Sequence, residues 1–104
     1  MLPLEKSTLK GTWATILLPY CEDGSICWEN IQLQLEFFKR SEVGGIYFNG
    51  TAGEFFSQTD EEYSQLLGVV SGFCEEHSIP CQAGASHAHP AGTLKRVAEA
   101  RKRN

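Results

Sequence analysis

The chain has 104 residues, of which 41% are hydrophobic, and 9 basic against 13 acidic residues give a formal net charge of −4. This charge argues against a nucleic acid as the main partner, because phosphate binding requires a basic surface. The hydrophobic fraction argues against disorder of the whole chain. The longest purely apolar run, Ile16–Leu18, is too short for a membrane span, so we expect no membrane partner.

The chain opens with a polar lead-in over residues 1–10, and we predict one domain over residues 11–104. The β-branched and aliphatic run Thr12–Leu18 does not alternate with polar residues. We therefore predict a strand that is buried on both faces and that Pro19 ends.

A turn is predicted at Glu22–Ser25. Apolar residues then recur at helical spacing, which predicts a helix over Trp28–Arg40. Glycines stop this helix, and Gly45–Asn49 is predicted as a second short strand. Residues Gly50–Gln58 are predicted as a loop.

A capping box predicts the start of a second helix, with Thr59 as the N-cap and Glu62 at the third helical position. Its apolar stripe consists of Tyr63, Leu66, Leu67, Val70, Phe73 and Cys74. A third strand is predicted over Ile79–Gly84. Pro90 suits the first turn of a third helix, in which one face is shared by Ala91, Leu94, Val97 and Ala98.

The fold class is predicted to be α/β, because strands that alternate with helices at this spacing pair in parallel through right-handed crossovers. Two architectures fit the βαβαβα pattern: a small doubly wound sheet, and the first three βα units of a (β/α)8 TIM barrel, which usually has about 250 residues. The sequence ends without a fourth strand. A three-stranded parallel sheet with two open edges is unusual for a complete domain, so we expect a partial barrel.

Four cysteines are present without a CxxC pair, at a density far below that of a disulfide scaffold. The N-terminus shows no long apolar stretch of a secretory signal. We therefore expect reduced thiols and a cytoplasmic protein. Cys81, His87 and His89 are near one another in sequence, but their spacing fits no common zinc motif. We expect neither a metal nor a cofactor.

The loop that follows the second strand carries the most information about function. Gly50 and Gly53 bracket two small residues, Thr51 and Ala52, at the end of a parallel strand, where α/β folds place their sites. Exposed amides and the Thr51 hydroxyl would suit a carboxylate or a phosphate. An ordinary strand–helix turn explains the composition equally well, and neither GxGxxG nor a P-loop is present.

The sequence resembles the N-terminal part of the dihydrodipicolinate synthase / N-acetylneuraminate lyase family over residues 10–102. The resemblance is carried by GTWATILLP at Gly11–Pro19, DG at Asp23–Gly24, GTAGE at Gly50–Glu54 and QAGAS at Gln82–Ser86. These stretches follow the family's order and spacing. The family's loop pattern is G-[ST]-T-G-E, which an acidic helix start follows, as TDEE does here.

This resemblance implies a (β/α)8 barrel in which a lysine forms a Schiff base with a 2-oxo acid such as pyruvate. The family's lysine lies on strand 6 and its proton-shuttle tyrosine on strand 5, so we expect both beyond this chain. None of the chain's own lysines is predicted at the top of a strand: Lys6, Lys10, Lys39, Lys95 and Lys102. The 104-residue chain alone is therefore expected to be inactive.

Part of the family's site carries over residue by residue. Thr51 matches the hydroxyl residue that hydrogen-bonds the shuttle tyrosine, which implies a role in proton relay. Ala52 stands where the family has the threonine that holds the substrate carboxylate, so only the amide contact remains. Gly50 and Gly53 match the glycines that shape the substrate-binding loop. Glu54 also matches, and a solvated carboxylate at a helix start is the simpler interpretation.

The implied partner is a small 2-oxo acid, and the full-length protein is expected to be a homo-oligomer. Two other interpretations remain open at this stage. The chain could be a non-catalytic interaction module that completes the sheet edge of a full-length relative. It could also be a small flavodoxin-like binder that uses the Gly50–Glu54 loop.

Overall fold

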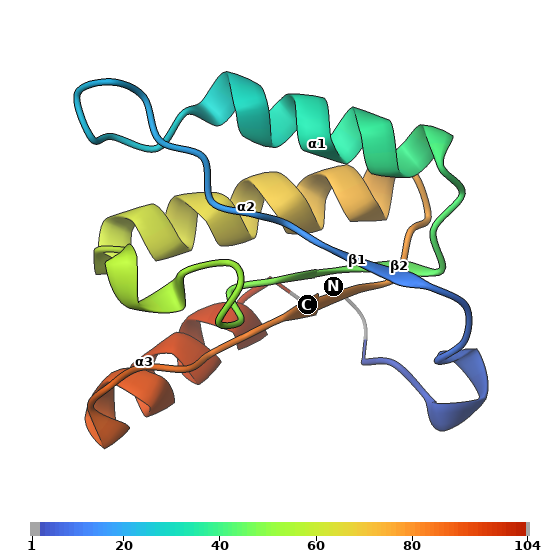
Figure 1. The fold of residues 1–104 in the computed structure, drawn as a ribbon. Helices are drawn as coiled ribbons and strands as arrows, with labels where there is room; N and C mark the ends of the chain where they lie inside the picture. The colour runs from blue at the N-terminus through green and yellow to red at the C-terminus, as the bar shows by residue number, and fades with distance from the viewer. Residues whose placement is uncertain (1–2, 104) are drawn as a thin grey trace.

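The computed structural model describes residues 3–103, in which three β-strands alternate with three α-helices (Figure 1). The elements are η1 (Lys6–Thr8), β1 (Trp13–Thr15), α1 (Trp28–Arg40), β2 (Gly45–Phe48), η2 (Phe55–Ser57), α2 (Asp60–Glu76), β3 (Cys81–Ala83) and α3 (Pro90–Arg101). The strands form one parallel sheet in the order β1-β2-β3. Within the described part of the chain, no helix is long and apolar enough to cross a membrane.

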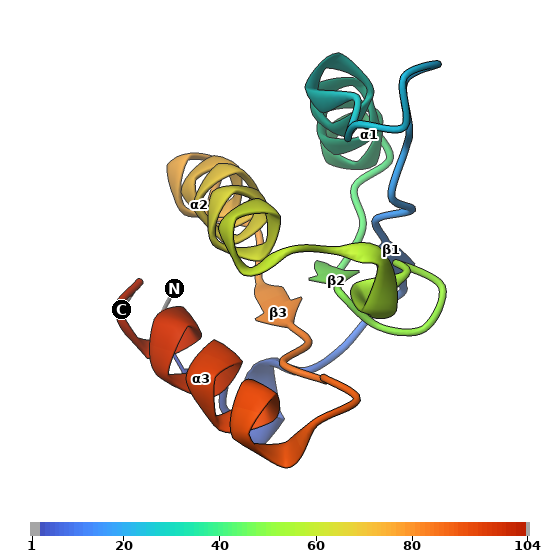
Figure 2. The same cartoon turned by 90° about the vertical axis from the view of Figure 1, so that its left-hand side faces the viewer.

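The helices cover one side of the sheet only. Figure 2 shows α1, α2 and α3 following one another around the outer side of a curved row of strands, as in an arc of a barrel. A doubly wound sheet has helices on both faces. The prediction of three βα barrel units is thus confirmed, and the doubly wound alternative is wrong.

Successive side chains of β2 point to opposite faces of the sheet, and the helices cover the face on which the apolar side chains lie. Ile46 and Phe48 are fully buried and belong to one core cluster with the apolar side chains of α1 and α2. Tyr47, which points to the opposite face, is only half-buried. The register places Tyr47 beside Thr15 and Gln82, so these side chains share the inner face of the arc.

Strand β1 is shorter than the predicted Thr12–Leu18, and it is not buried on both faces. Ile16 is buried, whereas Leu17 is 57% exposed. The strand ends because the Gln34 side chain on α1 takes both backbone groups of Leu17. Its amide nitrogen donates to the Leu17 carbonyl at 2.7 Å, and its oxygen accepts from the Leu17 N–H at 2.9 Å. The Gln34 side chain thus forms the two hydrogen bonds that a neighbouring strand would otherwise make with Leu17.

The second helix begins as the capping box predicts. The Thr59 hydroxyl accepts from the Glu62 N–H at 3.1 Å, and the Glu62 carboxylate accepts from the Thr59 N–H at 2.8 Å. Every residue of the predicted apolar stripe is buried: Tyr63, Leu66, Leu67, Val70, Phe73 and Cys74. Helix α2 therefore supplies much of the core.

The third helix is oriented differently from what its apolar residues suggest. Leu94 is 72% exposed and Val97 is 41% exposed, whereas Arg96 is only 3% exposed. A cationic side chain thus occupies the position in this helix that faces the other elements.

The orientation of α1 predicts that substitutions of two leucines in this helix differ greatly in their effect on stability. Leu35 is fully buried and Leu33 is 65% exposed. We expect Leu35→Ala to lower the free energy of unfolding by about 2–5 kcal/mol, because it removes packed core atoms. Leu33→Ala is expected to change it by less than about 0.5 kcal/mol. Urea denaturation of both variants measures this, and equal losses would contradict the assigned orientation.

Candidate functional site

The carboxyl ends of the three strands meet at one edge of the sheet, on the left of Figure 1 and facing the viewer in Figure 2. The segments that follow β1, β2 and β3 gather there. This edge is where βα barrels place their sites, because the loops after the strands converge on it. The segment after β2 contains the sequence-predicted site residues.

Both ends of the Gly50–Gly53 loop are marked by left-handed backbone at residues with side chains. Asn49, just before the loop, has φ 61°, and Glu54, just after it, has φ 51°. Such conformations are uncommon for residues other than glycine, and the surrounding structure must maintain them. The loop's shape is thus determined at its two ends.

The glycines of the loop allow close approach of neighbouring groups. A Cβ atom on Gly50 would lie 2.5 Å from Cε1 of Tyr47, so the tyrosine ring packs directly on the loop. A Cβ atom on Gly53 would lie 3.1 Å from the carbonyl oxygen of Ile16 at the end of β1. Both glycines thus permit close packing around the loop.

Two backbone hydrogen bonds close the loop internally. The Glu54 N–H donates to the Thr51 carbonyl at 3.0 Å, and the Phe55 N–H donates to the Gly50 carbonyl at 3.4 Å. Thr51 and Ala52 are exposed, and among residues 3–103 their N–H groups and the Thr51 hydroxyl have no hydrogen-bond partner. The arrangement therefore offers two amides and one hydroxyl to an anionic ligand.

Two amide side chains, one buried and one partly buried, connect the two ends of this loop. Nε2 of Gln58 donates to Oδ1 of Asn49 at 2.6 Å and lies 3.5 Å from the Gly53 carbonyl. Asn49 is only 1% exposed. Gln58, which comes after η2, thereby ties the start of the loop to its end.

Sequence reasoning missed Arg96, which reaches this region from α3. Its Nη1 donates to the carbonyls of Ser86 at 2.7 Å and Phe55 at 3.0 Å, and its Nη2 donates to the Gln58 carbonyl at 3.3 Å. The guanidinium carbon lies 4.7 Å from the centre of the Tyr63 ring. The amphipathic pattern of α3 carries no signal for this role, because an arginine among small and polar residues normally indicates a solvated position.

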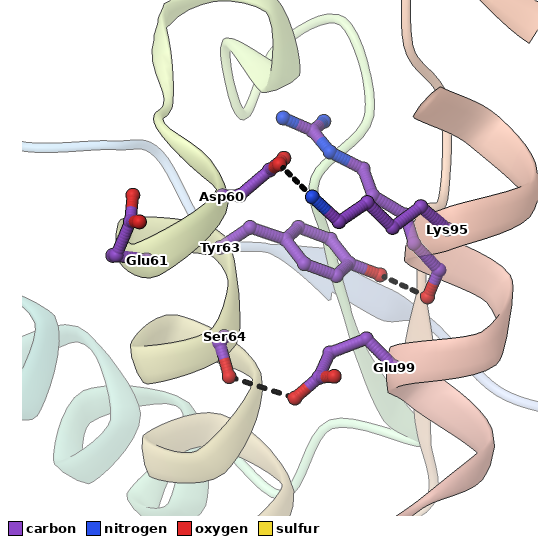
Figure 3. Close-up of a pocket in the computed structure, with 7 residues that line it drawn as sticks. Asp60, Glu61, Tyr63, Ser64, Lys95 and Glu99 are labelled. Carbon is purple, nitrogen blue, oxygen red and sulfur yellow. Dashed lines mark hydrogen bonds and ion pairs between the residues drawn. The ribbon is translucent and has the colours of Figure 1, made fainter. Parts of the chain in front are cut away.

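A groove of about 210 Å³ lies between α2 and α3, away from the Gly50–Gly53 loop (Figure 3). Lys95 pairs with Asp60 at 2.8 Å across it, and the Ser64 hydroxyl donates to Glu99 at 2.8 Å. The hydrogen bond from Lys95 lowers the pKa of Asp60. Burial raises the pKa of Tyr63, whose hydroxyl donates to the Gly84 carbonyl at 3.3 Å. Four of the groove's polar side chains thus pair across it, Asp60 with Lys95 and Ser64 with Glu99.

The two histidines of the β3–α3 loop are exposed. Nδ1 of His87 accepts from the His89 N–H at 3.0 Å, and a Cβ atom on Gly92 would lie 2.5 Å from the His87 ring. Among residues 3–103, no three histidine, cysteine, aspartate or glutamate residues are grouped as metal ligands.

The sequence and the fold both match known proteins. The model of the dihydrodipicolinate synthetase family matches residues 8–100. A 4-hydroxy-tetrahydrodipicolinate synthase of Laribacter hongkongensis (strain HLHK9) is 33% identical over 89 residues, which cover 85% of this chain and 31% of that enzyme.

Two solved structures show the same arrangement of elements. A catalytic lysine mutant of the sialic acid aldolase of Ruminococcus gnavus matches with a TM-score of 0.85 and 22% identity, over 96% of this chain and 32% of that chain. The chloride-inhibited dihydrodipicolinate synthase of Acinetobacter baumannii, complexed with pyruvate, matches with a TM-score of 0.83 and 21% identity, over 92% of this chain and 33% of that chain. This chain therefore spans about a third of the length of the proteins that it matches.

The close approach of β3 to the loop predicts a strong effect of Gly84→Ala. A Cβ atom at Gly84 would collide with the backbone carbonyl of Asn49, whose carbon lies 2.7 Å away, and backbone cannot rotate aside as a side chain can. We expect a loss of about 1–3 kcal/mol in the free energy of unfolding.

The matched control is Gly72→Ala on α2, where a Cβ atom meets nothing within 4 Å. It should raise the free energy of unfolding by about 0.5–1 kcal/mol, because alanine favours a helix over glycine. Thermal and urea denaturation compare the two, and equal effects at both positions would contradict the packing described.

Proposed function

The chain belongs to the dihydrodipicolinate synthetase family, and on this premise we propose that it is the N-terminal part of a lysine Schiff-base lyase or aldolase. The substrate that we propose is pyruvate or a related 2-oxo acid. The observation that carries the proposal is the exposed Thr51–Ala52 segment of the Gly50–Glu54 loop at the carboxyl edge. The N–H groups of these two residues have no hydrogen-bond partner in residues 3–103. The pyruvate bound to the Acinetobacter baumannii relative supports the substrate class.

The loop binds the carboxylate of the substrate through the amides of Thr51 and Ala52. Gly50 and Gly53 let the backbone come close to its neighbours, as their contacts with Tyr47 and Ile16 indicate. Ala52 supplies no hydroxyl donor. A hydrogen bond to a charged group contributes about 1.5–3 kcal/mol. Without a hydroxyl at position 52, the loop therefore binds the carboxylate more weakly but keeps the amide contacts.

The amine that forms the Schiff base comes from sequence beyond residue 104. Schiff-base catalysis needs a lysine that is desolvated at the site so that it is nucleophilic. Lys95 is on α3, where its side chain is 72% exposed and its ammonium pairs with Asp60. Lys10 precedes β1 at the opposite edge of the sheet, and the remaining three lie in η1, α1 and the turn after α3. The 104-residue chain alone therefore lacks the nucleophile.

Thr51 takes part in proton relay and not mainly in binding. Its hydroxyl is exposed and, in the described residues, unpartnered, so it is available to a phenol supplied by the remainder of the barrel. General acid–base catalysis requires hydrogen-bond contact between the relay groups.

The full-length protein is proposed to be a homo-oligomer.

Borohydride trapping tests the proposal. Reduction in the presence of pyruvate converts a Schiff base into a stable secondary amine and so marks the reacting lysine. We expect the longer protein that contains this chain to gain the mass of the reduced pyruvate adduct on one lysine beyond residue 104. The 104-residue chain is expected to gain none. A specific adduct on any lysine of the short chain would contradict the assignment, and no adduct on the longer protein would overturn the function.

The role of Thr51 is tested by Thr51→Val in that longer protein. Loss of a relay hydroxyl should lower kcat by about 10²-fold or more while KM changes little, because the contact matters in the transition state. Ala52→Thr is the companion variant, and it should retain kcat and lower KM for the 2-oxo acid. Steady-state kinetics measures both, and an unchanged kcat for Thr51→Val would remove Thr51 from the relay.

A further inference from the structure

We propose that Arg96 is a positioning residue, whose guanidinium holds the Gly50–Gly53 loop in the shape that receives the substrate carboxylate. This inference rests on the proposed function, and it assigns a site role to a residue that lies on a helix outside the loop.

The burial of Arg96 is the first observation. The residue is 3% exposed, and neither of the ion pairs found within residues 3–103 includes it. A guanidinium is permanently charged, and a buried charge without an ionic partner costs free energy. An apolar side chain of similar size would fill the same space without that cost. Packing alone therefore does not explain an arginine here.

The partners of the guanidinium are the second observation. They are three backbone carbonyls from two different loops: Phe55 and Gln58 after β2, and Ser86 after β3. The planar fork of an arginine can serve several acceptors at once in a fixed geometry, which a lysine cannot do. Stacking on the Tyr63 ring at 4.7 Å fixes the plane of that fork. Arg96 thus joins two loops of the carboxyl edge.

The path from Arg96 to the binding loop is short on both sides. Phe55 directly follows Glu54, whose left-handed backbone ends the loop. Gln58 is held through its carbonyl by Arg96 and reaches Asn49 through its side chain, at the loop's other end. One side chain therefore acts on both ends of a loop that is otherwise closed by two backbone hydrogen bonds of its own.

If Arg96 only stabilised the fold, its loss would increase opening of the core and of the loop by similar factors. If Arg96 positions the loop, its loss should increase opening of the loop more than opening of the core. Local openings of a native protein can be separated from global unfolding by amide hydrogen exchange. The informative amides are those of Glu54 and Phe55, which close the loop, compared with that of Ile46 in the core.

The experiment uses the 104-residue chain and does not depend on turnover. Arg96→Leu removes the three donated hydrogen bonds and keeps an apolar filler. Arg96→Lys keeps the charge without the fork. Arg101→Leu changes an exposed arginine of the same helix, and Val70→Ala weakens the core without touching the loops. Exchange rates are measured for each variant, and pyruvate is titrated while the amide shifts of Thr51 and Ala52 are followed.

In Arg96→Leu we expect the exchange of Glu54 and Phe55 to rise about tenfold or more relative to Ile46, because hydrogen bonds from a charged group are lost. Affinity for pyruvate should fall by about tenfold. In Arg96→Lys the loop exchange should also rise and the pyruvate affinity should also fall, each by a smaller factor. In Arg101→Leu and Val70→Ala the ratio of loop to core exchange should stay within about twofold of the wild-type ratio.

The proposal is overturned if Arg96→Leu raises loop and core exchange in the same proportion as Val70→Ala does. It is also overturned if the loop loosens and pyruvate affinity stays unchanged. Should Arg96→Leu fail to fold, the same two criteria are applied to Arg96→Lys. The proposed function is decided separately, by borohydride trapping in the longer protein. If Thr51 and Ala52 of the wild-type 104-residue chain do not respond to pyruvate, the exchange ratio alone decides whether Arg96 holds the loop.

Discussion

The alternation of side chains along the central strand β2 is the constraint on which the remaining structure depends. Ile46 and Phe48 are fully buried in the cluster with α1 and α2, so all three helices must lie on that side. Tyr47 therefore belongs to the inner face, where it packs on Gly50. Because β2 is parallel to β1 and β3, the loops that follow the three strands all lie at the carboxyl edge of the sheet. Core packing and the location of the site thus have the same origin.

The loop at that edge is held by its surroundings as well as by its own backbone hydrogen bonds. The middle of the loop is exposed, while its ends, Asn49 and Glu54, have backbone that must be held in a disfavoured region. The supporting groups are the amide of Gln58 and the guanidinium of Arg96. The N–H groups of Thr51 and Ala52 stay available as donors because the hydrogen bonds that close the loop use neither of them.

The sequence predicted α1 and α2 well, because amphipathic spacing and the Thr59 capping box are local signals that the structure repeats. The face predicted for α3 was wrong, because Arg96 is buried while Leu94 and Val97 are exposed. The loop's place at the carboxyl edge follows from strand–helix alternation, and its roles come from the family resemblance. The end of β1 could not be predicted, because the Gln34 side chain takes the place of a strand partner across a long sequence separation. Arg96 was missed because the partners that keep it buried are backbone carbonyls, which leave no trace in residue types.

The hydrogen bonds of Gln34 also limit the length of the free edge of β1. Both outer strands, Trp13–Thr15 and Cys81–Ala83, have three residues each. An open strand edge is a template for pairing with another molecule, and its length determines how many backbone groups a second strand can bind. By occupying the backbone of Leu17, Gln34 keeps the β1 edge from becoming longer. A contact between α1 and the end of β1 therefore also leaves fewer backbone groups at this edge for another strand to bind.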